Sequence, residues 1–165
     1  MIKIIEDNIV NLDVDGIVNA ANSFLFGGGG IDGAIHKAAG QALYDACDKI
    51  GHCDVGQAVI TPGFDLKARY IIHTVGPMYA HYDIETNEKL LRACYINSLN
   101  LAKENNLKSI AFPCISTGAY GYPLLDACNI ALDAVKNWLE KNNYEIDIYL
   151  VCFRKEEYNI FKQIS

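Results

Sequence analysis

Four consecutive glycines, Gly27 to Gly30, separate an apolar segment from an amphipathic one. The residues after them place apolar side chains at the i, i+3, i+4, i+7 spacing of one helical face, so the glycines precede a helix N-terminus. Free backbone N–H groups and the positive end of the helix dipole meet at such a point, which favours an anion. Glycine also lets the backbone approach a ligand closely because it has no Cβ. The run therefore predicts an anion-binding loop.

Three polar residues near these glycines could carry chemistry: Asn22 at the end of an expected strand, and Asp32 and His36 on the expected helix. The spacing of four between Asp32 and His36 places them on one helical face, opposite the alanines. A carboxylate repels an anion, so we expect Asp32 to face a neutral part of the ligand, such as a sugar hydroxyl or a water. The set predicts a sugar-phosphate site. The alternatives are structural: Asp32 as a first-turn residue and His36 as a hydrogen-bonded core histidine.

A second glycine-containing loop, at 114–122, repeats these features. It reads Cys-Ile-Ser-Thr-Gly-Ala-Tyr-Gly-Tyr and lies between a short apolar strand and a helix expected from Pro123 onward. Two such loops can bind a pyrophosphate from both sides through their N–H groups. Neither loop contains Lys or Arg, and the first basic residue near them is Lys37.

The elements that must position these loops alternate between strand and helix. Expected strands cover 2–5, 14–18, 55–61, 70–75, 109–113 and 146–153, and expected helices cover 31–48, 85–105, 123 onward and 156–164. Such alternation is typical of an α/β sandwich around a mostly parallel sheet. Both loops then fall at the carboxyl ends of strands, where open sheets bind ligands. With 165 residues and no linker or repeat, we expect one domain, 1–165.

The composition argues against several classes of partner and site. The net charge of −6 at pH 7 disfavours nucleic acid and membrane surfaces as partners. No apolar run approaches ~20 residues and the N-terminus does not resemble a signal peptide, so we expect a cytoplasmic protein. The six cysteines are expected to be buried, reduced thiols. Cys47, His52 and Cys53 are an alternative metal site, but they lack the C-x₂-C spacing, and we expect neither a metal nor a cofactor.

Two common phosphate-binding motifs fit this chain poorly. The P-loop requires a Gly-Lys dipeptide, which is absent. Gly28, Gly30 and Gly33 formally satisfy the G-x-G-x-x-G pattern of dinucleotide-binding folds. That motif needs an abrupt turn after its strand, whereas residues 22–26 separate the strand from these glycines. A dinucleotide site is therefore a weaker alternative.

Three segments together resemble the macrodomain family, and within it the MacroD type. They are IVNAANSFLFGGGGIDGAIHKAAG at 17–40, IIHTVGP at 71–77 and FPCISTGAYGYP at 112–123. The resemblance extends over essentially the whole chain and implies a three-layer α/β/α sandwich with a mixed, mostly parallel six-stranded sheet. It also implies binding of ADP-ribose, removal of ADP-ribose from modified acidic side chains of proteins, and deacetylation of O-acetyl-ADP-ribose.

The resemblance also implies roles for individual residues. Asn22 would hold the distal ribose, Asp32 would orient or activate the attacking water, and Phe153 would stack near the adenosine. The family's adenine-contacting aspartate aligns with Asn8, whose amide oxygen accepts a weaker hydrogen bond than a carboxylate. The catalytic candidates are Asn22, Asp32 and His36. The expected ligand-binding residues are Asn8, Ile9, Asn22, Gly29, Gly30, Ile31, Asp32, Ser116, Thr117, Gly118, Ala119, Tyr120 and Phe153.

Two functions could use this pocket: a hydrolase that attacks the distal ribose or its acyl ester, and a reader that binds ADP-ribose without turnover. Asp32 separates them, because binding a diphosphate does not require a carboxylate. Glycosidases usually need a second carboxyl group as general acid, and neither loop contains one. A Glu or Asp side chain, with a free pKa of about 4, leaves as a stable carboxylate, whereas an arginine nitrogen leaves as a strong base. We therefore expect ADP-ribose and proteins ADP-ribosylated on acidic residues as partners, with arginine- and serine-linked modifications spared.

Overall fold

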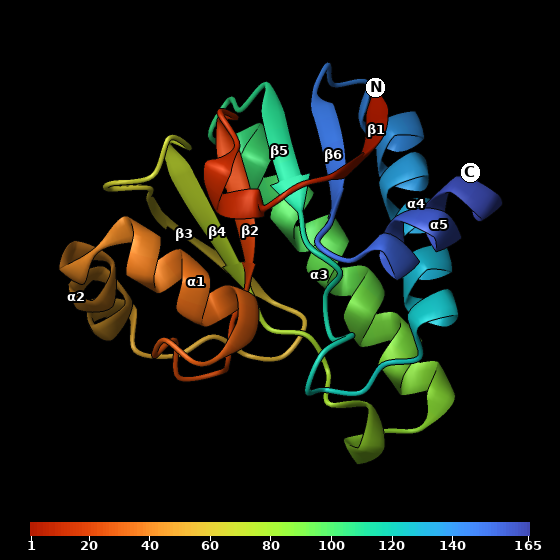
Figure 1. Ribbon diagram of the computed structural model, residues 1–165, viewed down its shortest axis with the longest axis horizontal. Helices are drawn as coiled ribbons and strands as arrows, with labels where there is room; N and C mark the ends of the chain where they lie inside the picture. The colour runs from red at the N-terminus through yellow and green to blue at the C-terminus, as the bar shows by residue number, and fades with distance from the viewer.

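Six short strands form one mixed sheet in the computed structural model, which describes residues 1–165 (Figure 1). Their spatial order is β1-β6-β5-β2-β4-β3. Every neighbouring pair is parallel except β3 and β4, which are antiparallel. The predicted mixed, mostly parallel sheet is therefore confirmed. The strands are β1 (Ile2–Glu6), β2 (Gly16–Ala20), β3 (Ala58–Pro62), β4 (Tyr70–Thr74), β5 (Ser109–Phe112) and β6 (Asp147–Cys152).

Five α-helices cover the sheet and complete the predicted three-layer sandwich. Helices α1 and α2 lie on one face, α3 and α4 lie on the other, and α5 packs against α4 and the β1 edge (Figure 1). None of these helices is long and apolar enough to cross a membrane. The helices are α1 (Gly30–Ala39), α2 (Gln41–Ile50), α3 (Ile84–Glu104), α4 (Leu124–Asn142) and α5 (Lys155–Ile164), with 3₁₀ turns η1 (Ile9–Asn11) and η2 (Tyr79–His81).

Successive side chains along the central strands pack on opposite faces of the sheet. Ile17 and Ile71 belong to a core of 14 buried residues beneath α1 and α2. Their chain neighbours Val18 and Ile72 belong to a core of 25 buried residues beneath α3 and α4. Because both faces are covered, these strands are continuous apolar runs rather than alternating ones. The sheet is thus a rigid base for the loops that leave its carboxyl edge.

The single helix predicted over 31–48 is wrong. Two helices, α1 and α2, occupy this stretch and are separated by Gly40, whose φ of +96° lies in the region that favours glycine. The Gly40 N–H donates to the His36 carbonyl and ends α1. A Cβ at Gly40 would lie 2.9 Å from Asp65 Oδ2, so this corner also needs the missing side chain.

The buried face of α1 also differs from the prediction. Asp32, Ile35 and His36 are buried, whereas Ala34 and Ala38 are exposed. The two polar residues therefore point inward, because hydrogen-bond partners for them lie on that side and exposed alanines forfeit little apolar burial.

Candidate functional site

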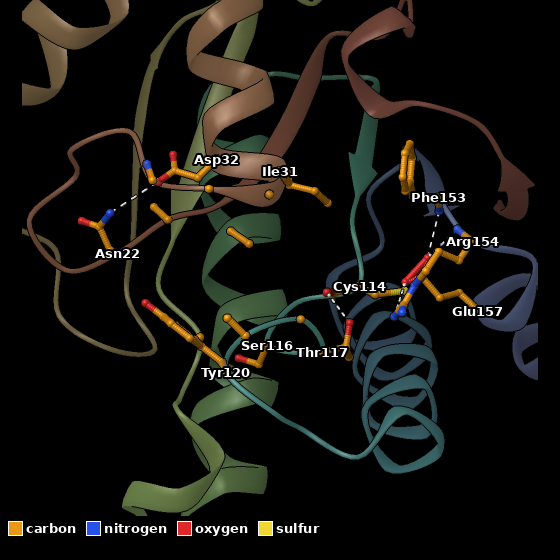
Figure 2. A pocket seen from close by; sticks show the side chains of 18 of the residues that line it. Asn22, Ile31, Asp32, Cys114, Ser116, Thr117, Tyr120, Phe153, Arg154 and Glu157 are labelled. Carbon is orange, nitrogen blue, oxygen red and sulfur yellow. Dashed lines mark hydrogen bonds and ion pairs between the residues drawn. The ribbon is translucent and has the colours of Figure 1, made fainter.

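A cavity of about 610 Å³ lies between the loop that follows β2 and the loop that follows β5 (Figure 2). Because β2 and β5 are parallel neighbours, their carboxyl ends meet at one edge of the sheet, as predicted. Every residue predicted to bind the ligand lines this cavity except Asn8 and Ile9. The lining consists of Ala20, Ala21, Asn22, Gly28, Gly29, Gly30, Ile31, Asp32, Gly76, Cys114, Ser116, Thr117, Gly118, Ala119, Tyr120, Val151, Phe153, Arg154 and Glu157.

The N-terminus of α1 opens onto this cavity. Gly29 is the N-cap residue and no side chain caps the helix, so the first N–H groups of α1 are available to a ligand. A Cβ on Gly29 or Gly30 would meet no atom within 4 Å, so both glycines border open space. At Gly33, by contrast, a Cβ would clash with the Gly28 carbonyl, so only glycine allows the loop to pack this closely on the helix.

The second loop is held in shape by its own backbone. The Tyr122 N–H donates to the Ser116 carbonyl at 2.9 Å, and the Gly121 N–H donates to the Gly118 carbonyl at 3.0 Å. The N–H groups of residues 117–120 have no acceptor within the protein. A Cβ on Gly118 would again meet no atom within 4 Å. The two loops therefore provide neutral N–H donors on both sides of the cavity, as an anion site requires.

The Asp32 carboxylate is fixed in the cavity wall by several donors. Its Oδ1 accepts from Asn19 Nδ2 at 2.8 Å, and its Oδ2 accepts from the Gly28 N–H at 3.0 Å and from Asn22 Nδ2 at 3.4 Å. His36 Nδ1 lies 3.0 Å from Oδ1. Asp32 is only 5% exposed, yet it lines the cavity. These partners hold the carboxylate in one orientation beside Asn22 (Figure 2).

A chain of buried polar groups continues behind Asp32. Asn19 Nδ2 also lies 3.1 Å from His73 Nδ1, and His73 Nε2 lies 2.9 Å from Thr61 Oγ1, which donates to the Pro62 carbonyl. Burial lowers the pKa of His73 to about 4, so the imidazole is neutral at neutral pH. Nδ1 then accepts from Asn19 and Nε2–H donates to Thr61, an assignment made from the hydrogen-bond network. His73 is therefore a core histidine with a hydrogen-bond partner at each ring nitrogen.

Asn19 is a site residue that the sequence prediction missed. It lies in β2 and is fully buried, although its neighbours along the strand are apolar. A lone amide in a strand buried on both faces must find a polar partner, and this signal could have identified Asn19. Its side chain links the sheet to Asp32 in the cavity wall.

His36 lies behind Asp32 and does not line the cavity. It is 1% exposed, and its Nδ1 lies 3.0 Å from both the carbonyl and the carboxylate of Asp32. Burial opposes a charge on this imidazole, but hydrogen bonding to Asp32 and Cys47 and the negative charge of Asp32 together raise the pKa of His36 to about 10. This place behind Asp32 fits a positioning role for His36, and its catalytic role stays a prediction.

Tyr120 is a further polar side chain near Asp32. Burial and the negative charge of Asp32 raise the pKa of its phenol above the usual value of 10, so the hydroxyl keeps its proton. Figure 2 shows the ring reaching from the second loop toward the end of the cavity that contains Asn22. Tyr120 can donate a hydrogen bond there, but it is a poor general acid at neutral pH.

The opposite end of the cavity is formed by residues that follow β6. Phe153 is 69% exposed and so does not belong to the core. Glu157 Oε1 accepts from the N–H groups of Phe153 and Arg154 at 2.9 and 3.0 Å, and Arg154 Nη2 lies 3.8 Å from Glu157 Oε2. Arg154 is the only cationic side chain in the lining, and the sequence prediction missed it.

Asn8 and Ile9 lie beside the cavity and not in its lining. Asn8 Oδ1 accepts from the Val10 N–H at 3.2 Å and caps η1, so this oxygen already has a donor. Ile9 is buried in the smaller core. The Asp7 N–H donates to the Cys152 carbonyl at 3.0 Å, which places this segment next to the end of β6.

The alternative metal site at Cys47, His52 and Cys53 does not form. His52 Nε2 instead lies 2.8 Å from the Asp54 carboxylate. No group of three or more His, Cys, Asp or Glu side chains in this chain could hold a metal ion. All six cysteines are unpaired, and five of them are buried.

The fold and the cavity define a class: an α/β domain with an anion site built from two loops beside an oriented carboxylate. A model of the Macro domain family matches residues 18–131. The chain belongs to the macrodomain family.

Similar proteins include the human ADP-ribose glycohydrolase MACROD2, which is 48% identical over 163 residues, covering 98% of this chain and 38% of that protein. An O-acetyl-ADP-ribose deacetylase from Escherichia fergusonii is 48% identical over 168 residues, covering 99% of this chain and 94% of that protein. The chain therefore spans 38% of the length of the human and Xenopus laevis MACROD2 proteins, but nearly the whole bacterial deacetylase.

Solved structures agree with the fold. The Oceanobacillus iheyensis macrodomain with ADP superposes with a TM-score of 0.93 at 42% identity, covering 97% of this chain and 87% of that chain. The Trypanosoma brucei macrodomain in complex with ADP-ribose superposes with a TM-score of 0.91 at 41% identity, covering 99% and 68%. The predicted family and fold are confirmed.

Proposed function

We propose that this chain binds ADP-ribose in the cavity and removes it by hydrolysis from modified Glu and Asp side chains of proteins. It also deacetylates O-acetyl-ADP-ribose in this proposal. The family membership supports this proposal, as do the names of relatives that cover nearly the whole chain. The diphosphate would lie between the N–H donors of the two loops. The distal ribose would lie at Asn22 and Asp32, and the adenosine would lie at Phe153.

One observation carries the catalytic half of the proposal: a buried carboxylate, Asp32, lines an anion site and is held there by Asn19, Gly28 and Asn22. A reader does not require this group, because the diphosphate is bound by N–H donors and a nearby negative charge opposes it. A hydrolase needs it, because an oriented carboxylate can accept a proton from the attacking water. The geometry therefore favours an enzyme over a reader.

The chemical identity of the leaving group follows from the lack of a general acid at the end of the cavity that contains Asp32. The only other carboxylate in the lining, Glu157, lies at the Phe153 end and accepts from two backbone N–H groups. Tyr120 keeps its proton because its pKa is raised. No acid of suitable strength therefore stands beside Asp32 to protonate a departing atom. A departing carboxylate needs no such proton, since its conjugate acid has a pKa of about 4, and this holds for a Glu or Asp side chain and equally for acetate that leaves the anomeric carbon of O-acetyl-ADP-ribose.

The experiment has two stages. First, ADP-ribose is titrated into the protein by calorimetry, and we expect micromolar affinity or better, with AMP and ribose phosphate binding much more weakly. Second, peptides carrying ADP-ribose on Glu, Ser or Arg are incubated with the protein at equal concentrations, and released ADP-ribose is measured. We expect release from the Glu peptide alone. Binding without any release would favour the reader, and equal release from all three would reveal a general acid.

A further inference from the structure

Two phenylalanines stand exposed on the loop between β2 and α1. Phe24 and Phe26 are 67% and 57% exposed, and their ring centroids are 6.4 Å apart with an interplanar angle of 18°. The His52 ring meets the Phe24 ring edge-on at 5.7 Å. We call these three side chains the aromatic ledge. Exposed apolar groups gathered in this way are characteristic of interaction surfaces.

Hydrogen bonds fix the ledge to the reactive end of the cavity. Asn22 Oδ1 accepts from the Phe24 N–H at 3.2 Å, and Asn22 Nδ2 donates to the Phe26 carbonyl at 2.6 Å. Leu25, between the two phenylalanines, is 2% exposed and anchors the loop in the core. The Cys53 N–H donates to the Ser23 carbonyl at 2.9 Å, which ties the segment containing His52 to the same loop. The ledge therefore has a defined position relative to Asn22.

The ledge lies outside the cavity but next to the point where a substrate protein must leave it. Phe24 and Phe26 do not line the cavity, whereas Asn22 does. Figure 2 shows Asn22 at the end opposite Phe153. On the proposed function, on which this inference rests, the bond to be cut lies at Asn22 and Asp32. The polypeptide then begins there and extends away from Phe153, past the loop that carries the ledge.

The spacing of the rings suggests the conformation of the bound segment. In an extended chain, side chains on one side repeat every two residues, or about 6.6 Å. The two ring centroids are 6.4 Å apart. An extended segment with apolar side chains at alternate positions therefore matches the two rings in register.

We propose that the aromatic ledge binds the polypeptide of the modified protein and selects targets whose modified acidic residue is flanked by apolar side chains at alternate positions. The ledge makes no contact with ADP-ribose itself. It acts on the affinity for the protein part of the substrate and leaves the chemistry at Asp32 unchanged.

The test uses two peptides with the same ADP-ribosylated Glu, one with leucines at alternating flanking positions and one with serines there. The wild-type protein should process the leucine peptide with a kcat/KM about fivefold or more above that of the serine peptide, and the difference should lie in KM.

The double substitution Phe24→Ser and Phe26→Ser should abolish this preference. It should leave the calorimetric Kd for ADP-ribose and the rate on O-acetyl-ADP-ribose within about twofold of wild type. The matched control is Ile84→Ser, which removes an exposed apolar side chain from α3 and should retain the preference.

Each outcome decides between named possibilities. Equal kcat/KM for the two peptides in the wild-type protein overturns the inference while leaving the proposed function intact. A double variant that loses ADP-ribose affinity also overturns it, since the ledge would then act through Asn22.

If light scattering finds a wild-type dimer that the double variant lacks, the ledge is a contact between two copies of this chain. If the wild-type protein binds ADP-ribose without turnover, the calorimetric Kd values of the two peptides replace the rates, and equal Kd values overturn the inference. A protein that binds no ADP-ribose refutes the proposed function and this inference together.

Discussion

The two ends of the cavity are built in opposite ways. At one end Asp32 is 5% exposed and accepts hydrogen bonds from Asn19, Gly28 and Asn22. At the other end Phe153 is 69% exposed, and only its backbone is held, by Glu157. A group that takes part in a reaction must be fixed in one geometry, whereas a ring that supplies stacking area tolerates small displacements. The difference assigns chemistry to the first end and affinity to the second.

This comparison also predicts different costs of change. Removing one partner from a buried polar network leaves another group unsatisfied and costs about 1–3 kcal/mol of stability. Truncating an exposed side chain is usually within about 0.5 kcal/mol of neutral. Variants at the Asp32 end should therefore lower turnover and stability, and variants at the Phe153 end should lower affinity alone.

The largest change in affinity is expected in the loop that follows β5, because its N–H groups are proposed to hold the diphosphate that joins the two ends of the ligand. Gly118→Glu should abolish ADP-ribose binding, because the new side chain fills the space between the loops and its charge repels the diphosphate. A like-charge contact costs several kcal/mol, which is more than about 100-fold in Kd. Gly118→Ala is the matched control: its Cβ meets no protein atom within 4 Å, so the loop should keep its shape and any loss of affinity should be far smaller than in the Glu variant. Unchanged calorimetric affinity in the Glu variant would place the diphosphate elsewhere.

Asn19→Ala tests the buried end without touching the ligand. The substitution removes the donor to Asp32 Oδ1 and the donor to His73 Nδ1. We expect turnover to fall by about 10–100-fold, the usual range when a group that orients a reacting residue is lost. The Kd for ADP-ribose should stay within about threefold. A loss of affinity with normal kcat would contradict the assignment of chemistry to this end.

Phe153→Ala tests the exposed end in the converse way. Stacking of a base on an aromatic ring contributes about 1–3 kcal/mol, so we expect Kd for ADP-ribose to rise about tenfold. The kcat at saturating substrate and the melting temperature should not change. Phe153→Tyr should restore the affinity, because it restores the ring. If Phe153→Ala lowers kcat at saturation, the two ends are not separable.

The smallest change in the rate of hydrolysis is expected from varying the pH, because neither buried histidine changes its charge near neutrality. The two histidines should instead make the stability of the fold depend on pH. His73 has its pKa lowered from 6.5 to about 4, so only the unfolded chain gains a proton as pH falls through this interval, and stability is lost. His36 has its pKa raised from 6.5 to about 10, so its contribution is complete below 6.5 and is lost as pH rises toward 10. Thermal unfolding between pH 5 and 8.5 should show greatest stability near 6.5. His73→Gln should flatten the acid side and His36→Gln the alkaline side, and unchanged slopes in both variants would contradict this account.

The sequence was sufficient for the parts of the site that depend on distinctive local residues. The glycine run and the loop at 114–122 stand out as ligand-binding loops, and Gly28 to Gly30 and residues 116–120 do line the cavity. The order of strands and helices follows from apolar periodicity, since each element buries a face. These features could be predicted because their cause lies within a few residues of chain.

The features that could not be predicted depend on partners far away in sequence. The inward orientation of Asp32 and His36 requires Asn19, and Asn19 in turn requires His73 from another strand. Periodicity assigns polar residues to the solvent side unless such partners are known. Arg154 enters the cavity from the turn after β6, more than one hundred residues from the first glycine loop.

The most direct test of the central claim is turnover and affinity measured on one variant, Asp32→Ala, beside Asp48→Ala, which removes an exposed carboxylate of α2 outside the cavity. Asp32→Ala should release ADP-ribose from a Glu-modified protein about 10²–10⁴-fold more slowly, the range for a positioned acid–base group. Its Kd for ADP-ribose should remain within about tenfold or improve, because a negative charge near the diphosphate is gone. Asp48→Ala should match wild type in both. A normal rate in Asp32→Ala would contradict the account, because the oriented carboxylate would then take no part in hydrolysis.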